Sequence, residues 1–355
     1  MMRIHLKNPT VQAICVVWLL FLLLTVTGRF SLSLYGEHYA MPITMVFGSL
    51  IAGATSEGGG AVAFPVMTLL LGIAPQTARD FSLMIQSVGM LAAAYTIIRL
   101  RLKVIPQAIA WGSLGGAIGV CIGISWIGPR LDPAFLKLFF VSLWLSFGTA
   151  LYLINSVSAI PIKQKIGRFG RQHALFFVAT GILGGCVSGM IGSGLDIVVF
   201  SVLTLSFRID EKVATPTSVV LMGVNAGVGF LWRLLVAPQS VLSGLGAVSL
   251  PPIGSEVWDY WYVCIAIVVI GAPVGARLIT RVNRMTIVYF LLVSIVVQFL
   301  GALLIVPWRS LGLGWLIISS FVGGSILFGA LSLFGQKEIF SRRNNIARRK
   351  NVFDR

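Results

Sequence analysis

The sequence predicts an all-α membrane protein with about eight transmembrane helices and two further broken segments, arranged as two repeats. Three observations support this prediction. Hydrophobic residues make up 57% of the 355-residue chain and charged residues only 11%, whereas roughly a quarter of a soluble protein is charged. Apolar runs of about 20 residues, each long enough to cross the hydrocarbon core, recur from Val11 to Phe334. Glycine-rich breaks interrupt two apolar segments at matching places.

The full spans follow the chain in a regular order. The first follows Arg3 and Lys7 as a signal peptide would, but it lacks a small-residue cleavage pattern, so we expect a retained span. Two apolar segments, 43–72 and 174–206, contain the glycine breaks. The spans are expected near 11–28, 81–98, 106–127, 135–154, 214–233, 259–280, 286–306 and 312–334.

The basic residues predict the orientation of the spans. If both broken segments enter and leave on one side, 21 of the 27 basic residues lie on one face, which is then cytoplasmic. If both segments cross fully, the better orientation places only 17 there. The pattern therefore favours re-entrant segments and both termini in the cytoplasm. The two units are then inverted, as in many secondary transporters.

An internal repeat supports this arrangement. Residues 53–97 align with 189–233 at a constant offset of 136, with ten identities and no gap. A later glycine pair recurs at an offset of 156, so the second half has gained about 20 residues in its external loop. The predicted divisions are an N-terminal span and external connection (1–42), repeat 1 (43–160), repeat 2 (161–306, with the external loop 236–258), a C-terminal span (307–336) and a basic cytoplasmic tail (337–355).

The glycine breaks are the first candidates for a binding site. A non-helical backbone at membrane depth is tolerated only where protein or water covers it, and glycine lets a ligand approach the N–H groups. Helices that resume after a break present free N–H groups to an anion. The alternative is that the breaks only shape packing. The predicted substrate-binding residues of the breaks are Ser56, Gly58, Gly59, Gly60, Gly192, Ser193 and Gly194.

Polar side chains of the following helices are expected to complete the site. Gln86 lies on one helical face with Ser82, and Ser218 and Asn225 lie on the matching face of the second repeat. Gln86 and Asn225 are predicted to line the site. Ser218 has the alternative of bonding its own backbone, as single serines in membrane helices usually do.

Two acids, Glu57 and Asp196, are placed at membrane depth by this topology. One interpretation is a proton-coupling pair, because burial favours the neutral form of a carboxylic acid. The other is that each acid caps the half-helix that follows it. Near the outer face, Arg79 and Asp80 are expected to pair with each other, while Arg233 is expected to extend to the membrane interface.

The order and doubling of these motifs resemble the sulfite-exporter TauE/SafE family, also called the toluene-sulfonate uptake permeases. The resemblance covers about residues 43–306 and implies transport of small sulfur-containing anions, such as sulfite or organosulfonates, across a bacterial inner membrane. Members commonly read Gly-x-Gly-Gly-Gly at each break, whereas here each break has gained an acid and lost glycine. The motifs are Gly58-Gly59-Gly60 with Phe64-Pro65, Gly181 to Gly194 with Val198-Val199-Phe200, Ala214-Thr215-x-x-Ser218 and Gly271-Ala272-Pro273-Val274-Gly275.

Other classes of function fit the sequence less well. The histidines His5, His38 and His173 lie outside the spans, so no membrane Ser–His dyad is expected, and no enzyme, cofactor or metal site is predicted. The net charge of +16 comes from basic clusters that flank the spans, which indicates topology and not nucleic-acid binding. A channel built on re-entrant segments and a carrier of a non-sulfur substrate remain as alternatives. The expected partners are a small anionic substrate and the lipid bilayer.

Overall fold

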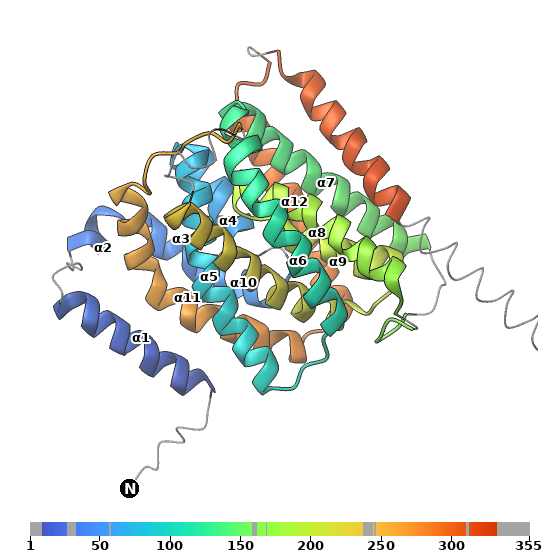
Figure 1. Ribbon diagram of the computed structural model, residues 1–355, viewed down its shortest axis with the longest axis horizontal. Helices are drawn as coiled ribbons and strands as arrows, with labels where there is room; N and C mark the ends of the chain where they lie inside the picture. The colour runs from blue at the N-terminus through green and yellow to red at the C-terminus, as the bar shows by residue number, and fades with distance from the viewer. Residues whose placement is uncertain are drawn as a thin grey trace, which may run out of the picture.

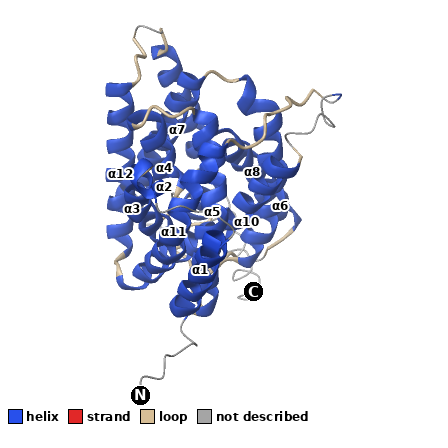
Figure 2. Ribbon diagram, turned by 90° about the vertical axis from the view of Figure 1, so that its left-hand side faces the viewer, coloured by secondary structure: helices blue, strands red, loops and turns tan. Residues whose placement is uncertain are grey.

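The computed structural model describes residues 9–26, 33–56, 58–157, 162–167, 169–236, 244, 246–309 and 312–331. The regular elements in these ranges are helices (Figure 2). Glu57, the first eight residues, residues 237–243 and 245 of the predicted external loop, and the basic tail lie outside the described residues, together with the predictions made for them.

Eight of the described helices are long and apolar enough to cross a membrane. Seven correspond to predicted spans. The eighth, α8, was expected to be half of a broken segment, yet its 21 residues extend about 31 Å. The predicted first span forms α1 (Pro9–Val26), which is outside the eight and packs on α11 at the edge of the molecule (Figure 1). The eight are Pro75–Arg99 (α5), Pro106–Arg130 (α6 and its continuation), Pro133–Leu153 (in α7), Arg171–Ile191 (α8), Glu211–Leu235 (α10), Ser255–Arg281 (α11), Val288–Ile305 (in α12) and Gly314–Leu331.

The two broken segments share one order of elements: a helix, a glycine break, a short helix and a π-helix. From the π-helices onward, the predicted offset of 136 reproduces the bounds, because η1 matches η4 and α5 matches α10 residue for residue. The remaining elements are α2 (Ser33–Glu37), α3 (Ala40–Ala54), α4 (Gly60–Pro65), η1 (Val66–Leu70), α6 (Pro106–Ile122), η2 (Gly123–Ile127), η3 (Gly128–Arg130), α7 (Pro133–Val157), α9 (Leu195–Ser201), η4 (Val202–Ser206) and α12 (Arg284–Ile305).

Before the breaks the register differs from the ungapped alignment. A Cβ atom placed on Gly53 would lie 1.9 Å from the carbonyl oxygen of Ala272. A Cβ atom on Gly185 would lie 2.4 Å from the carbonyl oxygen of Gly116, which is the residue matching Ala272 at the offset of 156. Gly53 therefore corresponds in its contacts to Gly185, one helical turn before the Gly189 that the alignment pairs with it. Helix α8 has one more turn before its break than α3.

In the most extensive contacts, a helix of one repeat packs against a helix of the other repeat. Helix α6 lies along α8 and α11 lies along α3, while α5 crosses α10 and α7 contacts α12 (Figure 1). Glycines bring the first two pairs into close contact, since Gly119 faces the backbone of Ile182 and Gly275 faces that of Leu50. Small residues at these positions were expected from the sequence, and they allow backbones to approach closely.

We expect Gly53→Ala to lower the stability of the protein by about 1–3 kcal/mol, because the added methyl group overlaps a backbone carbonyl that cannot rotate away. Thermal unfolding of the purified protein in detergent measures this loss. Gly301→Ala in α12 is the matched control, since nothing lies within 4 Å of its Cβ position. Equal losses in the two variants would contradict a close α3–α11 crossing.

Each broken segment returns to the end of the molecule from which it started. Phe207, which follows η4, stacks on Phe177 with ring centroids 5.5 Å apart and meets His173 at 5.6 Å, and both partners lie in the first turns of α8. In the first half, His38 before α3 and Phe81 near the start of α5 both contact the ring of Tyr260. The breaks thus lie at the turning points of two hairpins.

The outer surface of the bundle is apolar. Leu304 of α12 is 86% exposed, and Leu19 of α1 and Ile318 of the last helix are each 66% exposed. Side chains of this kind face lipid in a membrane protein, whereas the polar groups described below are buried. The chain is a multi-pass membrane protein.

Candidate functional site

The side chain of Gln86 touches both glycine breaks. Gln86 lies on α5 and is 2% exposed. Its Nε2 donates a hydrogen bond to the carbonyl oxygen of Gly192 in the second break, at 2.7 Å. A Cβ atom on Gly60 in the first break would lie 2.3 Å from the same nitrogen, and one on Gly58 would lie 2.7 Å from Oε1. The amide is therefore wedged between the two turning points.

The carboxylate of Asp196 also faces both breaks. Its Oδ1 accepts hydrogen bonds from the backbone N–H groups of Gly194 and Ile197, each at 3.1 Å. Its Oδ2 is buried and has no hydrogen-bond partner among the described residues, and a Cβ atom on Gly58 would lie 2.4 Å from it. One oxygen thus caps the start of α9, as the second interpretation of this acid predicts, while the other oxygen points at the first break.

Glycine is required at two of these turning points. Gly58 has φ +70° and Gly192 has φ +85°, a left-handed conformation that costs other residues about 1–2 kcal/mol. Gly192 ends α8, and a Cβ atom there would also lie 2.5 Å from that of Ser82. The glycines therefore fix the turns and let the two halves approach each other at the breaks.

Two of the three backbone donors predicted in the second break, the N–H groups of Gly192 and Gly194, already have partners. The N–H of Gly192 bonds the carbonyl of Ser188 at 2.7 Å, and the N–H of Gly194 bonds Asp196. The N–H of Leu195 bonds the hydroxyl of Ser188 at 2.9 Å. The physical reason is that buried N–H groups find internal partners, and here a serine and the additional acid supply them.

Several buried polar atoms near the breaks lack a hydrogen-bond partner among the described residues. Such a group costs about 1–3 kcal/mol when it stays unsatisfied. A concentration of them at the meeting point of two breaks indicates a site that a polar ligand completes. These atoms are Ser56 Oγ, Ser82 Oγ, Gln86 Oε1, Asp196 Oδ2 and both amide atoms of Asn225.

The other predicted site residues are distributed around this centre. Asn225 is fully buried, and its Oδ1 lies 2.9 Å from the Cβ position of Gly116, so it faces α6 and not Gln86's cavity. The hydroxyl of Ser218 donates to the carbonyl of Thr215 in its own helix at 2.9 Å, which is the alternative foreseen for it. Ser193 is fully buried in the second break.

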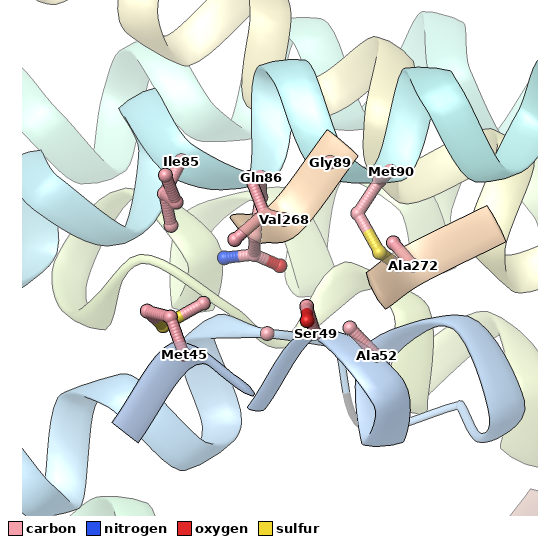
Figure 3. Close-up of a pocket in the computed structure, with 10 residues that line it drawn as sticks. Met45, Ser49, Ala52, Ile85, Gln86, Gly89, Met90, Val268 and Ala272 are labelled. Carbon is pink, nitrogen blue, oxygen red and sulfur yellow. The ribbon is translucent and has the colours of Figure 1, made fainter. Parts of the chain in front are cut away.

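Two cavities adjoin the first break. One lies between α3, α5 and α11, where Gln86 extends from α5 toward Ser49 (Figure 3). Its volume of about 10 Å³ holds roughly one water molecule. The other, of about 210 Å³, lies beside Thr55 and is lined by apolar side chains such as Leu278 and Phe290. The lining of the small cavity is also mostly apolar, and its polar side chains are Ser49 and Gln86.

A cluster of three buried charged residues, Arg79, Asp80 and Arg233, packs against the second break. Asp80 Oδ1 accepts from Arg79 Nε at 3.0 Å and Nη2 at 2.8 Å, which agrees with the predicted pair. Asp80 Oδ2 accepts from Arg233 Nε at 2.9 Å. The prediction that Arg233 extends to the interface is wrong, because its side chain is only 5% exposed. Because α5 and α10 cross in opposite directions, Arg233 near the end of α10 lies beside Asp80 near the start of α5. The inverted repeat predicted from the sequence already implies that these two helices run antiparallel.

No group of three His, Cys, Asp or Glu side chains that could hold a metal ion occurs within the described ranges. The four cysteines are free thiols, and none pairs with another. The chemistry at the breaks therefore rests on amide, hydroxyl, carboxyl and backbone groups.

The sequence matches a known protein family. The family model described as sulfite exporter TauE/SafE matches residues 41–304, well over half of the chain. The chain belongs to the TauE/SafE family. The match begins in α3 and ends in α12, so it contains both breaks of this TauE/SafE protein and leaves out α1 and the last helix. Comparison with curated proteins and with solved structures gives no match.

Proposed function

We propose that the chain is a secondary transporter of small anions, with sulfite or an organosulfonate as the first candidate cargo. The Gln86 side chain carries this proposal, since it bonds the second break while lying against the first. A cargo bound beside Gln86 contacts both halves of the molecule, so its binding is coupled to their relative movement. Membership of the TauE/SafE family supports the class of cargo.

The donors available for an oxyanion favour the first break. The N–H groups of Gly192 and Gly194 already have partners, so the cargo's oxygens bind the Ser56 and Ser82 hydroxyls and the backbone of residues 58–60. We keep Ser193 in the proposed site and leave out Ser218 and Asn225, because Ser218 bonds its own helix and Asn225 faces α6. Hydroxyl and amide groups suit an oxyanion because they are neutral and each can donate a hydrogen bond to one of its oxygen atoms.

The packing supports two inverted repeats. Helices α5 and α10 match residue for residue, yet they run antiparallel. Asp80 near the start of α5 pairs with Arg233 near the end of α10. At the other end, the N–H of Ile105, just after α5, bonds Thr217 Oγ1 near the start of α10 at 3.0 Å. Equivalent helices related in this way lie around a twofold axis in the membrane plane, which is the arrangement that alternating access uses.

We also propose that the protein lies in the inner membrane with both termini in the cytoplasm. The positions of the basic loops support this orientation. Lys103 donates a hydrogen bond to Gln164, and the N–H of Lys163 bonds the carbonyl of Arg208 at 2.7 Å. These segments carry several lysines and arginines and meet at one end of the bundle. Positive charge gathers on the cytoplasmic side of membrane proteins.

Flux measurements test the proposed function. The purified protein is reconstituted in liposomes, and uptake of sulfite, sulfoacetate, taurine and sulfate is measured with and without a pH gradient. We expect saturable flux of a sulfur oxyanion above the background of empty liposomes. Single-channel currents far above carrier turnover would assign a channel instead, and the absence of flux for every anion would contradict the proposal.

Proton coupling through Asp196 is part of this proposal. A charged Asp196 repels an anion beside Gln86, whereas the protonated acid turns its unpartnered Oδ2 into a hydrogen-bond donor or removes the repulsion. We expect Asp196→Asn to carry anions at a rate that no longer responds to a pH gradient, because asparagine keeps an oxygen for the α9 cap but cannot titrate.

The control for this prediction is Asp132→Asn. Asp132 also accepts a backbone hydrogen bond at a helix start, from the N–H of Ala134 at 2.7 Å, but it is exposed and far along the chain from either break. Its flux should keep the pH response of the wild type. An unchanged pH response in Asp196→Asn would remove the proton-coupling part of the proposal.

A further inference from the structure

The cluster of Arg79, Asp80 and Arg233 holds two positive charges and one negative charge inside the protein. The three residues are 1%, 4% and 4% exposed. Asp80 uses one oxygen for each arginine, and no second carboxylate pairs with either arginine within the described ranges. The cluster therefore has a net charge of +1 at a buried position.

An uncompensated charge of this kind is costly. Arginine stays protonated under all conditions that a protein tolerates, so the cluster cannot lower its charge by losing a proton. The Nη1 atom of Arg233 is buried and has no hydrogen-bond partner among the described residues. A small anion on this nitrogen would both satisfy the donor and neutralise the cluster.

We propose that the cluster is a second anion-binding site, which takes one small oxyanion on Arg233 and the neighbouring guanidinium group of Arg79. Asp80 holds the two arginines in place while the site is empty. This inference rests on the proposed function, because the oxyanion is the transported cargo on its way between the outer end and the breaks.

The cluster lies next to the breaks. A Cβ atom on Gly192 would lie 3.0 Å from the carbonyl oxygen of Arg79, so the second break packs directly on the backbone of the cluster. Ser82, with its unpartnered hydroxyl, also abuts Gly192. Gln86 follows Asp80 by six residues, about 9 Å along α5. An anion that leaves Arg233 thus finds the next unpartnered donors along the same helix.

The second repeat has no equivalent cluster. The residues that the repeat pairs with the cluster lie at the opposite end of α5 and α10, and all of them are uncharged. A buried charged site is therefore present at one end of the pathway only. The buried fixed charge therefore attracts cargo to the outer end of the pathway. The offset of 136 pairs Arg79 with Thr215, Asp80 with Pro216 and Arg233 with Ile97.

Binding stoichiometry tests the proposal. Calorimetric titration of the purified protein with sodium sulfite is expected to give two anions per wild-type chain. Arg233→Gln should bind one, because the cluster becomes neutral, while Gln86→Leu should lose the other site instead. Asp80→Asn should bind sulfite about tenfold or more tightly at the cluster, since it removes the competing carboxylate, and a gain of affinity cannot come from misfolding.

The matched control is Arg99→Gln. Arg99 lies at the opposite end of α5, is exposed and bonds Tyr95, so its loss removes the same charge without touching the cluster. It should keep both sites. One site in the wild type that survives Arg233→Gln and is lost in Gln86→Leu would overturn the inference and leave the proposed function intact. One site that shows the reverse pattern would support the cluster and overturn the site at the breaks.

Discussion

Replacing Gln86 with leucine should lower anion flux by about tenfold to hundredfold, the effect of losing a hydrogen bond to a charged ligand. Leucine fills nearly the same volume but lacks the amide, so it can neither bond the Gly192 carbonyl nor present an oxygen or nitrogen to cargo. Initial rates of sulfite uptake into liposomes that contain equal amounts of each protein measure the loss.

The control is Gln298→Leu. Gln298 lies on α12, its Nε2 bonds the hydroxyl of Ser294 at 3.0 Å, and its Oε1 is buried without a partner. It therefore matches Gln86 in residue type and in having an amide oxygen without a partner among the described residues, but its amide bonds α12 and neither break. Its flux should remain close to that of the wild type. A similar loss in both variants would mean that any buried amide in the bundle matters and that Gln86 has no special place.

The order of helices and breaks was predictable because glycine and apolar periodicity are local signals. The π-helices and the helices that follow them keep the offset of 136 read from the sequence. The length of α8 was not predictable, because residues 174–191 carry no charged residue or proline and only the conformation of Gly192 shows where the helix ends. A continuous apolar run does not reveal how far a helix extends before its break.

Side-chain partners were less predictable than positions. Gln86 was expected to line the site on the argument that a glutamine cannot satisfy itself in a helix, yet its Nε2 also bonds the carbonyl of Ser82 one turn away at 3.0 Å. Arg233 was expected at the interface, since a basic residue at a helix end usually extends to water. Only the crossing of α5 and α10 shows that a buried carboxylate lies beside it.

Of the two interpretations of Asp196, the contacts bear on the cap, and proton coupling stays a prediction. Its place after Gly194 predicts a cap, and Oδ1 does accept two backbone hydrogen bonds. The sequence does not specify the direction of the other oxygen, which depends on how the first break packs against the second. One oxygen of this carboxyl group therefore caps α9 while the other is buried without a hydrogen-bond partner among the described residues, and a test of proton coupling must keep the cap.

Replacing Gly58 with alanine should stop most of the transport, with a loss of flux of about tenfold or more. The methyl group would lie 2.4 Å from Asp196 Oδ2 and 2.7 Å from Gln86 Oε1, so both groups must move out of the place where cargo binds. The left-handed backbone at φ +70° adds about 1–2 kcal/mol of strain. Uptake rates and thermal unfolding in detergent measure the two effects separately.

Gly72→Ala separates backbone strain from crowding. Gly72 also has a left-handed backbone, with φ +66°, but nothing lies within 4 Å of its Cβ position. The two variants therefore share the conformational cost, and only Gly58→Ala crowds the meeting point of the breaks. Gly72→Ala should unfold at a somewhat lower temperature and still transport. If both variants lost transport equally, the strain of the backbone and not the contact between the breaks would explain the defect, and the assignment of the site to this meeting point would have to be abandoned.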